Sequence, residues 1–148
     1  MKKLILLLFI PLVFACSSSV RDSIRDLIPS ISSTTNSEED VRSALLVIAD
    51  EINKQCPMTV DAFTRLDNVA ILSERTVQYN YTLISQKKED FDLSYAKKNF
   101  YPKLVNEAKT NPGLKIFREL KVTLSYYYKD KNGLYITTYK IKPHQYLN

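Results

Sequence analysis

The apolar residues of this chain change their spacing three times after residue 36, and that succession of periods restricts the fold more than any other feature. Between Val41 and Ile52 they recur every three or four positions, which predicts an amphipathic helix. Ser37 is a suitable N-cap for this helix, and Pro57 stops it. The first helix therefore offers one apolar stripe to a core.

Two stretches of alternating apolar and polar residues and a second helical pattern follow. Residues 58–66 and 77–83 have the period of two that predicts strands, and the segment 67–75 between them is expected to be a loop. The next helical period runs over residues 93–110. Pro102 lies inside it and predicts either a kink or two short helices that meet nearby.

The last part of the chain predicts a β-hairpin. Residues 122–128 and 134–141 alternate on either side of a turn that contains Asn132-Gly133, the strongest short signal for a hairpin. The segment 114–120 fits either a short helix or the start of a strand. The order helix, hairpin, helix, hairpin predicts an α+β fold: a single two-layer domain with an antiparallel four-stranded sheet and helices on one face. Strand order does not follow from the sequence.

The beginning of the chain has the composition of an export signal. Lys2 and Lys3 precede an almost wholly apolar run at 4–14, and Ala15 is a small residue at the expected cleavage point. Because about 20 apolar residues are needed to cross a bilayer, this run is too short for a membrane span. We therefore expect residues 1–15 to be removed as a signal peptide.

The stretch 13–16, which reads Val-Phe-Ala-Cys, resembles the lipobox of bacterial lipoproteins. The resemblance implies that Cys16 carries a lipid anchor with acyl chains such as palmitate. The serine-rich residues 16–36 are then a flexible tether, and 37–148 form the globular domain. By the same resemblance, Ser17 after the anchor implies the bacterial cell envelope, at the periplasmic face of the outer membrane or at the cell surface.

A second resemblance lies inside the globular part. The strings 52–61 and 64–67, with the pattern Tyr79-x-Tyr81-x-Leu83, are similar to a segment of small bacterial exported or membrane-linked proteins. This resemblance agrees with export and implies no activity.

Charge and residue types exclude several classes of function. Without residues 1–15 the chain keeps 19 of its 21 basic residues and all 16 acidic ones, a net charge of +3 that is too weak for nucleic-acid binding. His144 and Cys56 alone cannot form a zinc site, and glycines only at Gly113 and Gly133 exclude a phosphate-binding loop. No metal or cofactor is expected, and Cys56 is either a free thiol or paired between molecules.

Catalysis is not favoured by the residues either. Asp61 and Asp67 are the nearest candidates for a carboxylate pair of the kind that hydrolases use. They share the solvent face of a predicted strand with Arg65, so solvated charges or a surface ion pair explain them better than catalysis does. A hydrolase, carbohydrate-active or other, that uses these surface carboxylates remains the alternative from another class.

Tyrosine is the unusual component, with ten in the chain. Neighbouring strand residues point to opposite faces, so Tyr126 and Tyr128 are expected under the helices, and Tyr127, Tyr135 and Tyr139 on the open face. Cross-strand aromatic pairs stabilise a hairpin without any partner. Tyrosine is also favoured at protein interfaces, which makes these three residues a candidate interaction surface.

The leading hypothesis is a lipid-anchored binding or assembly module of the envelope, without catalytic activity, that contacts a partner protein. It presents either the open sheet face or the loop at Lys87 and Lys88 to that partner. The membrane is contacted through the lipid on Cys16. A structural lipoprotein that tethers two layers is a further alternative.

Overall fold

The structure is a computed structural model and describes residues 37–147. The expected signal peptide, the lipidated Cys16 and the tether at 16–36 lie outside the described residues. The elements are α2 (Glu38–Asn53), β1 (Met58–Thr59), β2 (Thr64–Ser73), β3 (Thr76–Leu83), α3 (Leu93–Asn99), α4 (Tyr101–Thr110), α5 (Lys115–Glu119), β4 (Thr123–Asp130), β5 (Tyr135–Ile141) and α6 (Pro143–Tyr146), with single 3-10 turns at Lys88–Asp90 and Pro112–Leu114.

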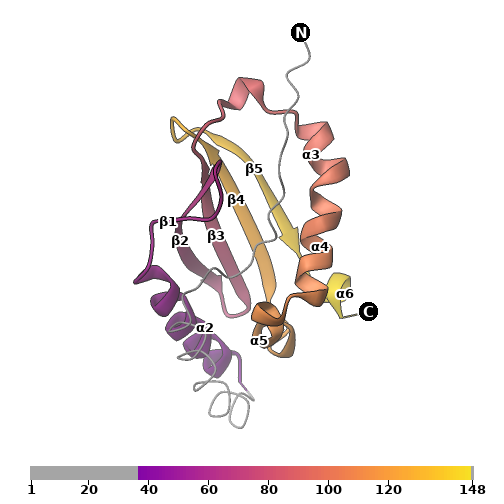
Figure 1. Ribbon diagram of the computed structural model, residues 1–148. Helices are drawn as coiled ribbons and strands as arrows, with labels where there is room; N and C mark the ends of the chain where they lie inside the picture. The colour runs from indigo at the N-terminus through magenta and orange to yellow at the C-terminus, as the bar shows by residue number, and fades with distance from the viewer. Residues whose placement is uncertain (1–36, 148) are drawn as a thin grey trace.

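The strands form one sheet in the order β1-β2-β3-β4-β5 (Figure 1). All neighbouring pairs are antiparallel except β3 and β4, which are parallel. The parallel pair arises because the chain returns through α3, α4 and α5 to the end of the sheet at which β3 began. The α+β class is thus confirmed, whereas the prediction of four antiparallel strands is wrong in the strand number and in the central pair.

The additional strand comes from the predicted strand at 58–66, which the structure divides. Met58 and Thr59 form β1 and pair with the first residues of β2, because the chain reverses between them. Asp61 stabilises that reversal by accepting the N–H of Phe63 at 2.7 Å. The expected loop at 67–75 is therefore mostly strand, and only residues 74 and 75 turn the chain into β3.

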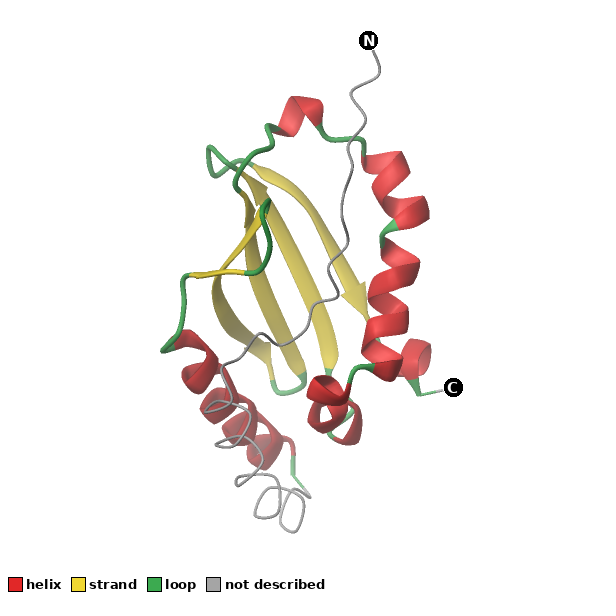
Figure 2. Cartoon of the chain, viewed as in Figure 1, coloured by secondary structure: helices red, strands yellow, loops and turns green. Residues whose placement is uncertain are grey.

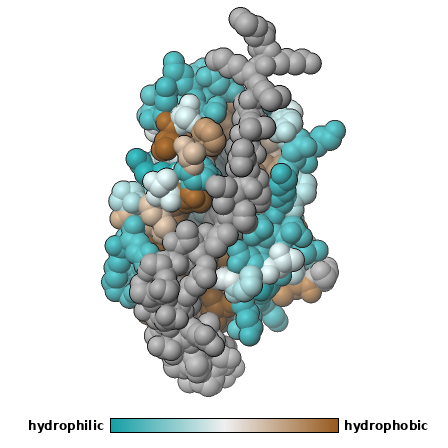
Figure 3. All heavy atoms as spheres, viewed as in Figure 1, coloured by the Kyte–Doolittle hydropathy of each residue, from teal (hydrophilic) through white to brown (hydrophobic). Residues whose placement is uncertain are grey.

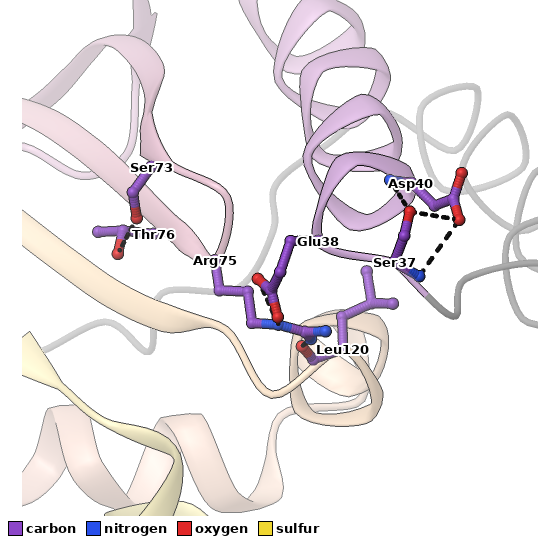
Figure 4. Close-up of polar contacts among 7 residues, drawn as sticks. All are labelled: Ser37, Glu38, Asp40, Ser73, Arg75, Thr76 and Leu120. Carbon is purple, nitrogen blue, oxygen red and sulfur yellow. Dashed lines mark hydrogen bonds and ion pairs between the residues drawn. The ribbon is translucent and has the colours of Figure 1, made fainter.

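Both helical predictions are confirmed. Ser37 caps α2 in a capping box: its Oγ accepts the N–H of Asp40 at 3.1 Å, and the Asp40 carboxylate accepts the N–H of Ser37 at 3.3 Å (Figure 4). At Pro102 the second pattern separates into α3 and α4, which meet at Phe100. The segment 114–120 is helical and contains α5.

A single core lies between one side of the sheet and the helices, with α2 near β2 and α4 near β5 (Figure 2). We call this side of the sheet the covered face. Tyrosines from β3 and β4 stack across it, with ring centroids 5.7 Å apart for Tyr79 and Tyr126 and 5.3 Å apart for Tyr81 and Tyr128. Among the described residues, the core extends from Val41 in α2 to Tyr146 in α6.

Candidate interaction surface

The other side of the sheet, here called the open face, carries polar and tyrosine side chains. They alternate with the core residues of β2, β3 and β4, and this alternation directs them away from the helices. The open face includes Arg65, Asp67, Asn68, Gln78, Asn80, Thr82, Ser125, Tyr127, Lys129 and Tyr135.

A row of hydrogen-bonded side chains crosses the open face over three strands. Asn80 donates to Asn68 Oδ1 at 2.6 Å and accepts from Gln78 Nε2 at 3.0 Å. Ser125 continues the row by donating to Gln78 Oε1 at 3.2 Å. An amide group has two donors and two acceptor sites, so the row holds these side chains in place and leaves further hydrogen-bonding capacity for a ligand.

The Asp67 carboxylate forms ion pairs with two basic side chains of this face, Arg65 and Lys129. Its Oδ1 lies 2.6 Å from Arg65 Nε, and its Oδ2 lies 3.1 Å from Lys129 Nζ and accepts the Thr82 hydroxyl at 2.6 Å. Burial opposes ionisation of Asp67, but the contacts with Thr82, Arg65 and Lys129 outweigh it and hold its pKa below the usual 3.8. A carboxylate held ionised in this way is poorly suited to donate a proton, so Asp67 does not suit the general-acid role in a pair of carboxylates.

Tyr127 and Tyr135 lie side by side on the open face, with ring centroids 5.3 Å apart. Tyr139 does not join them. It is 8% exposed and lies on the covered face, with its ring 5.9 Å from that of Phe100 and 5.8 Å from that of Tyr101. The expected three-tyrosine surface is therefore corrected to a pair.

A bulge in β5 explains the position of Tyr139. Tyr135 pairs with Lys129 and Thr137 pairs with Tyr128, so Ile136 is an extra residue that shifts the alternation by one position. No sequence signal marked this bulge. The alternation at 77–83 did mark Gln78 and Asn80 as facing away from the core, although their hydrogen-bonded row was not foreseen.

The other candidate groups lie elsewhere in the fold. Cys56 follows α2 as a half-buried free thiol, and burial, with a smaller effect from the charge of Asp67, raises its pKa. His144 belongs to α6, which packs beside α4. Within residues 37–147, no three His, Cys, Asp or Glu side chains lie close enough together to hold a metal ion, and no helix is long and apolar enough to cross a membrane.

Two hydrogen bonds join the loop at Lys87 and Lys88 to the β4–β5 hairpin. The N–H of Lys88 donates to Asp130 Oδ2 at 3.0 Å, and the N–H of Lys131 donates to the Gln86 carbonyl at 3.1 Å. Both lysine side chains are exposed. The loop thus has a fixed backbone with solvated charges.

Three solved structures have a similar fold. A protein from Pseudomonas aeruginosa, described as a candidate secreted protein, has a TM-score of 0.62 at 11% identity, over 73% of this chain and 94% of that one. The pilotin EpsS of the type 2 secretion system of Vibrio vulnificus has a TM-score of 0.58 at 7% identity, over 73% and 93%. The pilotin AspS of the type II secretion system of Vibrio cholerae has 0.56 at 6%, over 80% and 98%.

Sequence comparison adds a family. A family model described as "Domain of unknown function (DUF8479)" matches residues 42–135, which run from α2 to the start of β5. No curated protein matches the chain.

Proposed function

The chain belongs to the family described as "Domain of unknown function (DUF8479)", and we propose that it is a lipid-anchored, non-catalytic assembly module of the bacterial envelope. The observation that carries the proposal is the fold shared with two type II secretion pilotins over nearly the whole length of each. The sequence supports it separately through the export signal and the lipobox-like stretch 13–16.

The partner in this proposal is a protein component of a secretion apparatus, and it binds the open face at Tyr127 and Tyr135. Tyr135 is 47% exposed, and the rings of the pair contact each other. Tyrosines give a large contact area with little loss of side-chain entropy, and the amide row beside them offers fixed donors and acceptors. The surface therefore resembles a protein contact site more than a catalytic one.

The anchor is tested by mass spectrometry of the protein purified from its host membranes. The mature chain is expected to begin at Cys16 and to carry the mass of the attached acyl chains. A Cys16→Ala variant is expected to lose that mass and to leave the membrane fraction. An unmodified wild-type protein would contradict the anchor but not the partner surface.

The partner surface is tested with a photocrosslinking residue at position 135 of the full chain in its host. We expect one main crosslinked envelope protein, identified by mass spectrometry as a secretion component. The same residue at position 95 is the control, because Tyr95 is similarly exposed, at 51%, but lies on α3. Tyr127→Ser is expected to reduce the crosslink. The surface assignment fails if positions 95 and 135 capture the same proteins equally.

A further inference from the structure

The charges of the helices are separated along the chain. Residues 93–121, which contain α3, α4 and α5, include seven basic and two acidic residues, a net charge of +5. Residues 37–53, which contain α2, include five acidic residues and one basic residue, a net charge of −4. The modest net charge of the whole chain therefore conceals two helical regions of opposite sign.

Four of the seven basic residues belong to α3 and α4, namely Lys97, Lys98, Lys103 and Lys109. These helices turn Ala96, Leu104 and Ala108 toward the core. Lys97, Lys98 and Lys109 are exposed, and none of the ion pairs among the described residues involves them. Figure 3 shows hydrophilic residues along the right-hand side of the molecule, where Figure 1 places α3 and α4.

Two large side chains with apolar surface accompany these lysines. Leu93 and Tyr95 lie in the first turn of α3, and they are 50% and 51% exposed. Exposed leucine and tyrosine beside several lysines are typical of helices that lie in a membrane interface, where the apolar groups enter the headgroup region and the lysines contact phosphates.

We infer that the outer side of α3 and α4 is a membrane-contact surface that recognises anionic phospholipid headgroups. Because α3 and α4 follow each other directly along the chain, a bilayer that lies along their outer side can bring their exposed lysines within one Debye length, about 8 Å at physiological salt, of its headgroups. The acidic α2 is repelled by that bilayer, which fixes the orientation of the domain. The open face lies on the opposite side of the sheet from the core that these helices cover.

A lipid surface fits these residues better than an acidic protein does. The lysines occupy two successive helices, and a bilayer of many phosphates can neutralise all of them without a matched set of carboxylates. The exposed apolar groups at one end of α3 gain from entering the headgroup region. The inference goes beyond the proposed function, since it requires neither a lipid on Cys16 nor a partner protein.

The test measures sedimentation of the protein with vesicles of phosphatidylcholine alone or of an equal mixture of phosphatidylcholine and phosphatidylglycerol. The protein is residues 16–148 with Cys16→Ala, which removes the expected signal and anchor and keeps every described residue of the core. Binding is expected only to the mixed vesicles, and it is expected to weaken as salt is added.

A triple variant, Lys97→Gln with Lys98→Gln and Lys109→Gln, identifies the surface. Because each lysine near an anionic surface contributes about 1 kcal/mol, we expect its partition to fall on the order of 100-fold. The matched control is Lys87→Gln with Lys88→Gln and Lys131→Gln, which removes the same charge from exposed lysines at the hairpin end.

The control is expected to lose much less than the test variant, and both are expected to keep the wild-type midpoint of thermal unfolding. Equal losses in the two variants would show that net charge alone drives binding, and would overturn the inference. A wild-type chain that does not bind the mixed vesicles would overturn it as well. Neither result depends on the anchor or the partner.

Discussion

The Nε atom of Arg75 lies 2.8 Å and 3.0 Å from the two carboxylate oxygens of Glu38, which joins the β2–β3 turn to the first turn of α2 (Figure 4). The same guanidinium donates through Nη1 to the carbonyl of Leu120, and the Arg75 carbonyl accepts the N–H of Thr123 at 2.8 Å. Arg75 therefore connects α2, the β2–β3 turn and the entrance to β4 at the point where the described domain begins.

We expect Arg75→Ala to lower the free energy of unfolding by about 1–3 kcal/mol, because it leaves the part-buried carbonyl of Leu120 without its charged donor. Glu38→Ala is expected to cost less than about 1 kcal/mol, because the Glu38 side chain is 62% exposed and its ion pair is screened by water. Urea denaturation of both variants measures the difference. Equal losses would contradict the larger role given to the Leu120 contact.

The Asn53 side chain, at the end of α2, forms two hydrogen bonds with the backbone of β2, as a neighbouring strand would. Its Nδ2 donates to the Val69 carbonyl at 2.8 Å, and its Oδ1 accepts the Val69 N–H at 2.7 Å. β1 pairs with β2 only as far as Leu66, so this side chain satisfies backbone groups on the edge of β2 beyond that pairing.

Asn53→Ala is expected to lower the free energy of unfolding by about 1–3 kcal/mol, because it leaves two part-buried backbone groups unpaired. Hydrogen exchange of the Val69 amide should become faster at the same time. Asn53→Asp keeps the acceptor but loses the donor, so it should protect that amide better than alanine does. If exchange at Val69 does not change in the alanine variant, the contact is not formed in solution.

Acid should weaken the domain through Asp67. Its pKa is lowered in the folded protein, so its contribution to stability is present above the unfolded value near 3.8 and is lost as the pH falls through the folded value. In Asp67→Asn the midpoint of thermal unfolding should depend less on pH in this acidic range. Asp130 should also lose its contribution to stability as the pH falls. Burial opposes its ionisation, but hydrogen bonds from the backbone N–H groups of Leu134, Lys88 and Asn132 outweigh burial and lower its pKa. Parallel pH curves for wild type and variant would disprove the role of Asp67.

Alkali should unfold the domain cooperatively through the buried tyrosines. Burial raises the pKa of Tyr146 to about 12, and it also raises the pKa of Tyr81 and Tyr128 well above 10. The stability linked to these neutral phenols is complete below the unfolded pKa of about 10 and is lost as the pH rises through the folded values. The phenolate absorbance of the buried tyrosines should therefore rise together with the loss of circular dichroism. If all of the absorbance rises before the protein unfolds, the predicted link between the buried tyrosines and unfolding is wrong.

Local structure was largely predictable from the residues themselves. The cap at Ser37, the break at Pro102 and the turn at Asn132-Gly133 depend on side-chain and backbone preferences within a few residues. All three are present, and Gly133 has the positive φ of 84° that such a turn requires. The class of the fold followed from the order of these elements.

The parts that were not predictable depend on bulges and on strand pairing. An extra residue in β2 at Asp67 and another in β5 at Ile136 shift the alternation of side chains without any change in composition. The first brings Arg65, Asp67 and Thr82 into one cluster on the open face, and the second turns Tyr139 into the core. A period-two pattern cannot register such a shift, because a bulge is decided by contacts between strands.

By itself the sequence determined the export-like composition of its beginning and the sites where helices and turns start and stop, since these depend only on nearby residue types. The tertiary structure alone decided the parallel pairing of β3 with β4, and with it the stacking of Tyr79 on Tyr126. It also placed Tyr127 and Tyr135 on one face and the lysines of α3 and α4 on the other side. The physical reason is that strand pairing, and the side of the sheet on which each side chain lies, depend on contacts between segments distant in the chain. Local residue preferences do not encode such contacts.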